Sequence, residues 1–276
     1  MHPINKIPQK YSKISIIGLG YVGLPLAISF AEAGLTVYGL EVDQERLDLL
    51  FSGKSYVQDI SNERLINVTK NKGTLTVSKD YKLLEKADVV IICVPTPLNK
   101  TKDPDMSYIV DVSNEILKYI HKDQLIILES TVYPGATEEI VLPILQKSQL
   151  KIGEEFFLAF SPERVDPGRN DWKLHNTPKI IGGVTTSCVN HAIDLYRIIV
   201  ERVIPVSSIR VAEMVKLLEN TFRAVNIGLV NEIALICDRL GIDVWEVIDA
   251  ASTKPFGFMG FQPGPGLGGH CIPIDP

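Results

Sequence analysis

The chain has 276 residues, of which 45% are hydrophobic and 22% are charged. This composition is typical of a globular protein rather than a disordered one, and the length suffices for roughly two domains. The formal net charge is −5 and no run of basic residues is longer than two, so we expect neither nucleic acid nor a membrane surface as a partner.

The four cysteines lie far apart, without a CxxC pair or a Cys/His cluster at metal-ligand spacing. We therefore predict no disulfide framework and no metal site, and expect Cys93, Cys188 and Cys237 to be buried apolar side chains. Residues 14–31 are uncharged over the length of a membrane helix, but their glycines and proline favour a strand, a turn and a helix. Residues 1–13 do not resemble a signal peptide, so we predict a cytoplasmic protein.

Short runs rich in β-branched residues alternate with amphipathic stretches through the first two hundred residues. Continuous apolar strands separated by helices, such as those expected at 108–120 and 136–145, indicate a parallel sheet covered on both faces. The predicted fold class is therefore α/β, a Rossmann-like doubly wound parallel sheet. The expected strands lie in residues 13–18, 35–42, 73–78, 87–94, 124–130, 156–161, 178–183 and 203–207.

Residues 209–240 contain no proline and predict one helix about 48 Å long. Apolar side chains cover more of its circumference than a single packed face requires, so it either joins two domains or pairs with its copy in a homodimer. Gly241 is expected to end this helix, and a second helix is expected at 243–251. We predict an NAD-binding domain at 1–205 and a central helical region at 206–276.

The glycine pattern Gly18-x-Gly20-x-x-Gly23 follows the first strand and opens a helix, which is the context of a dinucleotide-binding turn. Gly18 would permit the tight turn, Gly20 would let the backbone approach a pyrophosphate, and Gly23 would allow close packing of helix and strand. Glu41, at the end of the next strand, would accept hydrogen bonds from the adenosine ribose and so favours NAD over NADP. Arg46 nearby could instead receive a 2′-phosphate.

Hydroxyl side chains follow two further strands of the predicted sheet. Thr96 comes after the fourth strand, and Ser130 and Thr131 come after the fifth. Ligands of open α/β sheets bind at the carboxyl ends of strands, so these residues are placed to line the cleft. Each could equally serve as a turn residue or a helix cap.

Four further positions carry reactive groups. Lys216 and Asn220 lie four residues apart and therefore on one face of the long helix, although such a lysine is commonly a surface residue. Glu163 could be a simple turn carboxylate. Cys271 differs from the other cysteines, because glycines and prolines surround it and no apolar helix or strand is available there to bury it.

Six motifs in order then resemble a known family: GLGYVGLPLA, CVPTPL, ESTVYPG, SPERVDPG, EMVKLLENTFRAVNI and PGPGLGGHCIPIDP. They are similar to those of the UDP-glucose/GDP-mannose dehydrogenase superfamily, and most similar to its UDP-N-acetylhexosamine branch. The resemblance extends from residue 14 to the last residue. It departs at Gly260, where the branch usually has proline, and at Glu41, where the family usually has aspartate.

The resemblance implies a four-electron oxidation of the sugar C6 alcohol to a carboxylate with two NAD. The implied substrate is UDP-N-acetylglucosamine, with UDP-N-acetylmannosamine and UDP-glucose as alternatives. Lys216, Asn220 and Asp275 would remove the alcohol proton and stabilise the alkoxide. Cys271 would form a thiohemiacetal and then a thioester, and Glu163 with Thr131 would activate the water that hydrolyses it.

The same resemblance implies two sets of binding residues. NAD would contact Gly18, Gly20, Tyr21, Val22, Gly23, Glu41, Arg46, Thr96 and Thr131. The substrate would contact Arg164, Val165, Lys216, Asn220, Arg223 and Gly268. The family's C-terminal UDP-binding domain is absent from these 276 residues, so an NAD-binding dimer module without turnover stays open. A two-electron β-hydroxyacid dehydrogenase is the remaining alternative.

Overall fold

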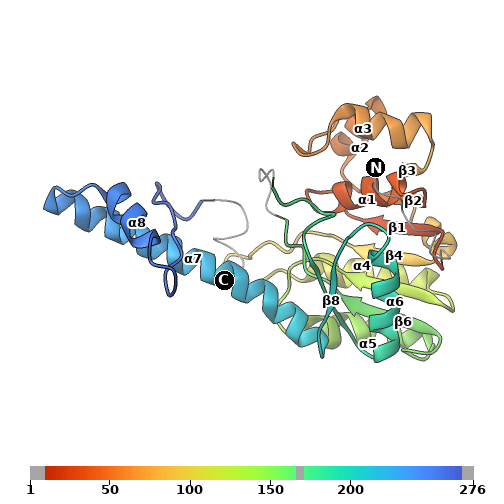
Figure 1. The fold of residues 1–276 in the computed structure, drawn as a ribbon. Helices are drawn as coiled ribbons and strands as arrows, with labels where there is room; N and C mark the ends of the chain where they lie inside the picture. The colour runs from red at the N-terminus through yellow and green to blue at the C-terminus, as the bar shows by residue number, and fades with distance from the viewer. Residues whose placement is uncertain (1–9, 166–170, 269–276) are drawn as a thin grey trace. The chain divides into compact units, whose positions relative to one another are not determined.

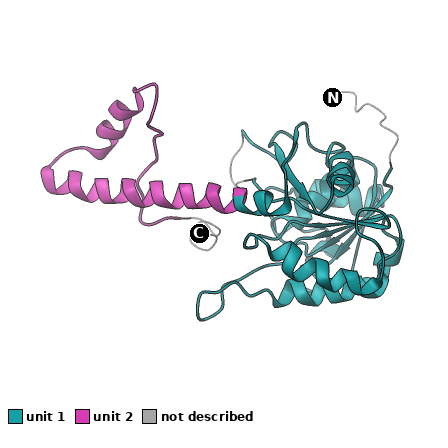
Figure 2. Ribbon diagram, turned by 90° about the horizontal axis from the view of Figure 1, so that it is seen from below, with its two compact units in different colours: residues 1–214 teal, residues 215–276 magenta. Residues whose placement is uncertain are grey.

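A computed structural model describes residues 10–165 and 171–268. The chain divides into two compact units, residues 1–214 and 215–276 (Figure 2). We expected a boundary before the long helix, at 205/206. That domain boundary stays a prediction; the two compact units divide inside the helix, α7 (Ile209–Leu240), whose first residues belong to the first unit.

Eight strands form one sheet in the order β3-β2-β1-β4-β5-β6-β7-β8 (Figure 1). Each lies within one of the eight runs that the sequence predicts. The chain order reverses between β1 and β4, and such a switch point is where open α/β sheets bind their ligands. The strands are β1 (Lys13–Ile17), β2 (Thr36–Leu40), β3 (Leu75–Ser78), β4 (Val89–Ile92), β5 (Gln124–Leu128), β6 (Phe156–Phe160), β7 (Lys179–Gly183) and β8 (Val203–Pro205).

The doubly wound α/β fold is confirmed, but one strand pair departs from the predicted parallel sheet. Strands β6 and β7 pair antiparallel, whereas β7 and β8 pair parallel. A parallel return normally needs a crossover helix. The described residues between β6 and β7 contain none, so the chain re-enters the sheet in the opposite direction.

Helices fill the connections between most of the other strands. The expected helix at 136–145 is divided into a π-helical turn and a short α-helix, because Pro143 at the start of that α-helix has no N–H group to donate. The helices are α1 (Gly23–Glu32), α2 (Gln44–Ser52), α3 (Asn62–Ile66), α4 (Ser107–Tyr119), α5 (Leu142–Leu145), α6 (Thr186–Tyr196), α7 and α8 (Val244–Ser252), with helical turns η1 (Asn67–Asn71), η2 (Tyr81–Lys86), η3 (Thr137–Val141) and η4 (Gln146–Ser148).

The core of the first unit lies against the central strands. Every residue of β4, β5 and β6 is buried, which requires cover on both faces of the sheet. On one face α1 and α6 pack into a single apolar cluster, in which the rings of Phe30 and Tyr196 lie 6.3 Å apart. Cys93, Cys188 and Cys237 are buried, as expected.

The second unit contains most of α7, the helix α8 and the segment that follows it. Gly241 ends α7 with φ +68°, and the N–H of Ile242 donates back to the carbonyl of Cys237, so the predicted helix end is confirmed. Asp243 caps α8 by accepting from the N–H of Trp245 at 2.9 Å. Within the described parts of the chain, no helix has the length and hydropathy needed to cross a membrane.

Candidate active site

The glycine-rich turn joins β1 to α1 at the switch point of the sheet. Gly18 has φ +89°, and a Cβ there would lie 2.6 Å from the carbonyl oxygen of Cys93, so only glycine fits. A Cβ on Gly23 would lie 1.9 Å from the Gly18 carbonyl oxygen. Around Gly20, by contrast, a Cβ would meet nothing within 4 Å. The backbone at Gly20 is thus open to a ligand beside the start of α1.

Next to this turn, Glu41 follows β2 and is almost fully buried. Its carboxylate accepts from the N–H of Leu19 at 3.1 Å, within the glycine turn, and from the N–H groups of two residues that follow it. Arg46 lies 3.5 Å from the same carboxylate and over the ring of Tyr56. The Tyr56 hydroxyl donates to the Leu19 carbonyl at 2.6 Å. The guanidinium is therefore already paired with Glu41, which leaves it less suited to a phosphate.

The loops after β4 and β5 are tied together by two hydroxyl groups. Thr96 donates to the carbonyl of Thr131 at 2.7 Å, and Ser130 donates to the carbonyl of Val94 at 2.7 Å. Both loops lie at the carboxyl edge of the sheet, beside the glycine turn. In the turn itself Tyr21 is exposed, so its ring is accessible there.

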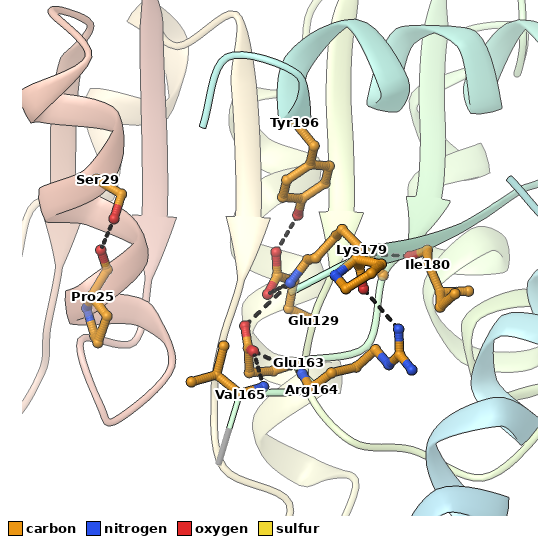
Figure 3. Close-up of polar contacts among 11 residues, drawn as sticks. Pro25, Ser29, Glu129, Glu163, Arg164, Val165, Lys179, Ile180 and Tyr196 are labelled. Carbon is orange, nitrogen blue, oxygen red and sulfur yellow. Dashed lines mark hydrogen bonds and ion pairs between the residues drawn. The ribbon is translucent and has the colours of Figure 1, made fainter. Parts of the chain in front are cut away.

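A buried cluster of charged groups lies at the ends of β5, β6 and β7 (Figure 3). Lys179, the first residue of β7, extends its ammonium to Glu129 Oε2 at 2.8 Å and to Glu163 Oε2 at 3.2 Å. Glu163 Oε1 accepts from the backbone N–H groups of Arg164 at 2.7 Å and Val165 at 2.6 Å. Both carboxylate oxygens of Glu163 are thus engaged from two directions.

Tyr196 of α6 completes this cluster from the other side. Its hydroxyl donates to Glu129 Oε1, and the Lys179 ammonium lies 5.2 Å from the centre of its ring. Burial, together with the Glu129 carboxylate, holds the pKa of Tyr196 far above its usual value. The phenol therefore stays protonated and remains a hydrogen-bond donor.

The pKa values of Glu163 and Lys179 follow from their pairing. Burial raises the pKa of Glu163, but the Lys179 ammonium and the two backbone N–H groups outweigh burial, so its pKa lies below the usual value. Burial lowers the pKa of Lys179, but the two carboxylates raise it above its usual value. Glu163 is therefore a carboxylate, and Lys179 an ammonium, at neutral pH.

The N-terminal end of α7 is fixed to the loop after β5. Glu213 is fully buried and accepts from the N–H of Gly135 at 2.6 Å and from the N–H and hydroxyl of Thr137. Arg210 also pairs with Glu138 at 2.8 Å. This anchoring joins the segment that follows Thr131 to the start of the long helix.

Within the second unit, the substrate residues expected on α7 share one face. Lys216, Asn220 and Arg223 follow one another at spacings of four and three residues. Asn220 is buried, and Lys216 and Arg223 are half-buried. A single helical face thus presents an ammonium, an amide and a guanidinium, which suits an oxygen-rich ligand.

The Asn231 side chain of α7 contacts the glycine-rich segment that precedes Cys271 at two points. Asn231 accepts from the N–H of Gly264 at 2.8 Å and donates to the carbonyl of Gly266 at 3.3 Å. Gly268 has φ +68°, in the region that favours glycine. Cys271 and Asp275 lie outside the described residues.

Comparison with protein families decides what kind of protein this is. Residues 12–200 match the NAD binding domain of the UDP-glucose/GDP-mannose dehydrogenase family, and residues 210–276 match its central domain. The chain belongs to the UDP-glucose/GDP-mannose dehydrogenase family. Its first unit therefore carries the family's NAD-binding domain, and the open backbone at Gly20 fits the approach of a pyrophosphate.

Several relatives in this family act on N-acetylhexosamines, according to their names. The chain is 42% identical to the UDP-N-acetyl-D-glucosamine 6-dehydrogenase of Pseudomonas aeruginosa, over 97% of this chain and 62% of that protein. It is 40% identical to the UDP-N-acetyl-D-mannosamine dehydrogenase of Pyrococcus horikoshii, whose structure matches with a TM-score of 0.89 over 95% of this chain and 62% of that one. The chain thus spans about three fifths of the length of these relatives.

A more distant structure shares the fold alone. The 3-hydroxyisobutyrate dehydrogenase of Mycobacterium tuberculosis matches with a TM-score of 0.64 at 17% identity, over 90% of this chain and 72% of that one. In the described part of the present chain, no three His, Cys, Asp or Glu side chains are grouped to hold a metal ion.

Several residues of the site were not found from the sequence. Lys179 and Glu129 stand at strand ends, where a charged residue is usually solvated, and Tyr196 lies in an ordinary amphipathic helix. Asn231 sits on the long helix outside the motifs, and Glu213 opens EMVKLLENTFRAVNI but was given no role. The available signal was a charged residue adjoining an apolar run, as in LIILE and KII.

Proposed function

We propose that this protein oxidises the C6 alcohol of a UDP-N-acetylhexosamine to the carboxylate, with UDP-N-acetylglucosamine as the first choice of substrate. UDP-N-acetylmannosamine and UDP-glucose are the alternatives. The observation that carries the proposal is the 42% identity to a UDP-N-acetyl-D-glucosamine 6-dehydrogenase across nearly the whole chain. The 40% identity to a UDP-N-acetyl-D-mannosamine dehydrogenase keeps the second substrate close behind.

The cofactor would be held at the switch point of the sheet. Gly18, Gly20 and Gly23 would admit the pyrophosphate, with Tyr21 and Val22 beside it at the start of α1. Glu41 would bind the ribose next to Arg46, and Thr96 and Thr131 would line the cleft. When bound, NAD supplies a hydride acceptor for each of the two oxidation steps.

In the first oxidation, the C6 alcohol must lose its proton as the carbon loses a hydride. We assign removal of this proton and stabilisation of the resulting alkoxide to Lys216 with Asn220, which share a face of α7, and with Asp275, which would hold an ordered water that accepts the proton. Arg164, Val165, Arg223 and Gly268 would hold the remainder of the substrate.

In the second oxidation, the Cys271 thiolate would add to the aldehyde carbon and form a thiohemiacetal. Loss of a second hydride from that carbon gives a thioester. Glu163, which is ionised and largely buried, would take a proton from the water that attacks the thioester, and Thr131 would help to position that water. The C–S bond then breaks, which releases the carboxylate and restores the thiol.

A substrate panel tests the proposal. UDP-N-acetylglucosamine, UDP-N-acetylmannosamine and UDP-glucose are each incubated with NAD, and NADH is counted per sugar consumed. We expect two NADH per sugar and the fastest turnover with UDP-N-acetylglucosamine. One NADH per sugar would contradict the four-electron reaction.

Cys271→Ser separates the two oxidations. Without the thiol no thioester can form, so we expect NADH per sugar to fall from two to one and an aldehyde-level product to accumulate. Cys237→Ser, a change of the same kind at a buried position on α7, serves as the control and should keep both oxidations. Continued formation of the carboxylate by Cys271→Ser would remove Cys271 from the mechanism.

A second candidate function is an NAD-binding dimer module without turnover. It is supported by the match of residues 12–200 to an NAD binding domain and by the exposed apolar side chains of α7. The test compares NADH production by the 276-residue chain with that of a fusion to the C-terminal part of the Pseudomonas relative. Steady-state turnover by the chain alone would exclude the module.

We further propose that the protein is a cytoplasmic homodimer joined through α7. The proposed dimer is supported by an exposed apolar row on α7 that includes Leu218, Phe222, Val225 and Leu229. The cytoplasmic location is proposed because NAD and nucleotide sugars are available there. Cell fractionation tests the location, and recovery in the membrane fraction would contradict it.

A further inference from the structure

Two carboxylates share a single buried ammonium beside the proposed hydrolytic base. The Lys179 side chain is 3% exposed, that of Glu129 is 0% exposed, and that of Glu163 is 16% exposed. Figure 3 shows the lysine between the two acids. Of these three side chains, Glu163 is therefore the most accessible to a water molecule, while the other two lie behind it in the interior.

Glu163 is also held in one orientation. Its Oε1 atom accepts from the N–H groups of Arg164 and Val165, and its Oε2 atom lies 3.2 Å from the Lys179 ammonium. Since the backbone contacts fix one oxygen, the lysine contact determines where the second oxygen points. Rotation of the carboxylate would break at least one of these charge-assisted hydrogen bonds.

We propose that Lys179 and Glu129 are positioning residues for Glu163: Lys179 sets the orientation and proton affinity of Glu163, and Glu129 keeps Lys179 neutralised while Glu163 carries a proton. The proposal rests on the function proposed above, in which Glu163 activates the hydrolytic water. It assigns a role to two residues that do not touch the substrate.

Proton accounting explains why two carboxylates are needed. When water attacks the thioester, a C–O bond forms and the water proton passes to Glu163, which becomes neutral. The C–S bond breaks, and the Cys271 thiolate leaves and later takes up that proton. If Glu163 were the sole partner of Lys179, its protonation would leave an unpaired buried ammonium, which is strongly unfavourable. Burial raises the pKa of Glu129, but the Lys179 ammonium 2.8 Å away and the Tyr196 hydroxyl favour its carboxylate form, so Glu129 would remain as the partner of Lys179.

Other titratable groups that act on the cluster support this arrangement. Tyr196 of α6 donates to Glu129 and stays protonated, and the buried Cys93 after β4 has a pKa raised by burial, so both are neutral. The Arg164 guanidinium donates to the carbonyl of Pro178 at 2.8 Å. Lys179 is therefore the charge that most lowers the pKa of Glu163.

The test uses two variants with opposite expected effects. Lys179→Met removes the positive charge that favours the ionised carboxylate, so the pKa of Glu163 should rise. Glu129→Gln removes a negative charge and leaves Lys179 paired with Glu163 alone, so the same pKa should fall. Two variants that merely loosened the structure would not shift one group in opposite directions.

Two readouts follow the shift. The first is a carbon-13 NMR titration of the labelled Glu163 carboxyl group, assigned with Glu163→Gln, which needs no turnover. The second is the acid limb of the pH profile for carboxylate formation, which should move with the NMR value. Lys122→Met is the matched control, because its lysine pairs with Glu155 at 2.7 Å on the surface and should move neither readout.

Each outcome has a distinct meaning. An unchanged Glu163 pKa in both variants, or shifts in the same direction, would overturn the proposal. If Lys179→Met does not fold, Glu129→Gln decides alone, because the amide retains the shape of the side chain. Lys179→Arg keeps the positive charge, so its Glu163 pKa should equal that of the wild type. The two variants could shift the Glu163 pKa as expected while the wild-type protein oxidises no nucleotide sugar. That result would contradict the proposed function and leave the electrostatic assignment standing.

Discussion

Two glycines of the turn after β1 differ in what surrounds them, and this difference separates stability from cofactor binding. An added methyl group at Gly20 meets no atom within 4 Å, whereas one at Gly23 would lie 1.9 Å from a backbone oxygen. The first position is therefore open, as the proposed contact with NAD requires, and the second must be glycine for the fold itself.

We expect Gly20→Ala to keep the free energy of unfolding within about 0.5 kcal/mol of wild type, because its methyl group has room. The same methyl group would obstruct a pyrophosphate, so the dissociation constant for NAD should rise roughly tenfold or more. Gly23→Ala should instead lower the free energy of unfolding by about 3 kcal/mol or more. Calorimetric unfolding and NAD titration measure both; equal NAD affinity in Gly20→Ala would contradict the assignment.

At this scale the sequence predicts roles that a motif suggests by itself and misses roles that depend on pairing across the sheet. Glu163 was found because SPERVDPG is a local pattern. Lys179 and Glu129 were not, because their pairing depends on β6 lying between β5 and β7 in the sheet. A one-dimensional pattern contains no such neighbour relation.

At the scale of elements, α7 does more than carry side chains towards a ligand. Its Asn231 holds both the N–H of Gly264 and the carbonyl of Gly266, so it fixes the segment that leads to Cys271. Asn226, on the same helix, donates only locally among its described contacts, to the carbonyl of Phe222 at 2.7 Å. Substitution of Asn226 is therefore a matched control for substitution of Asn231.

Asn231→Ala should speed hydrogen exchange at the Gly264 amide about fivefold, since one hydrogen bond of roughly 1 kcal/mol is lost. Asn226→Ala should leave that amide unchanged. Hydrogen-exchange NMR at Gly264 provides the measurement. Equal exchange in the two variants would mean that the segment is held by something other than Asn231.

The positions of strands and of the long helix could be predicted from the sequence, whereas the direction of one strand could not. All eight strands were found because each is a compact apolar run bounded by turn residues, and α7 was found over its full length because nothing interrupts it. The antiparallel pairing of β7 was missed. Strand direction depends on how the connection returns to the sheet, and the sequence of a strand is the same in either direction.

At the scale of the molecule, the two sides of α7 have different characters. Leu218, Phe222 and Val225 are exposed on one side. Lys216 and Asn220 lie on the opposite side, since each residue turns the helix by about 100°. A partner seated on the apolar side would leave the polar side available for substrate.

The double variant Leu218→Glu, Val225→Glu should therefore convert the proposed dimer to a monomer, because two charges would be buried in an apolar interface. Light scattering after gel filtration measures the mass. Phe51→Glu, at an exposed apolar position on α2, is the control and should remain a dimer. A double variant with dimeric mass would place the interface elsewhere.

Helix α7 continues without a break through the point where the two compact units divide, after Met214. Arg210 and Lys216 flank this point, yet their peptide bonds belong to a hydrogen-bonded helix, and proteases cleave exposed, irregular backbone instead. Trypsin would find its preferred side chains there, but the helical backbone would not fit its active site. Limited digestion should thus trim loops while the cofactor-binding half and the remainder stay in one piece.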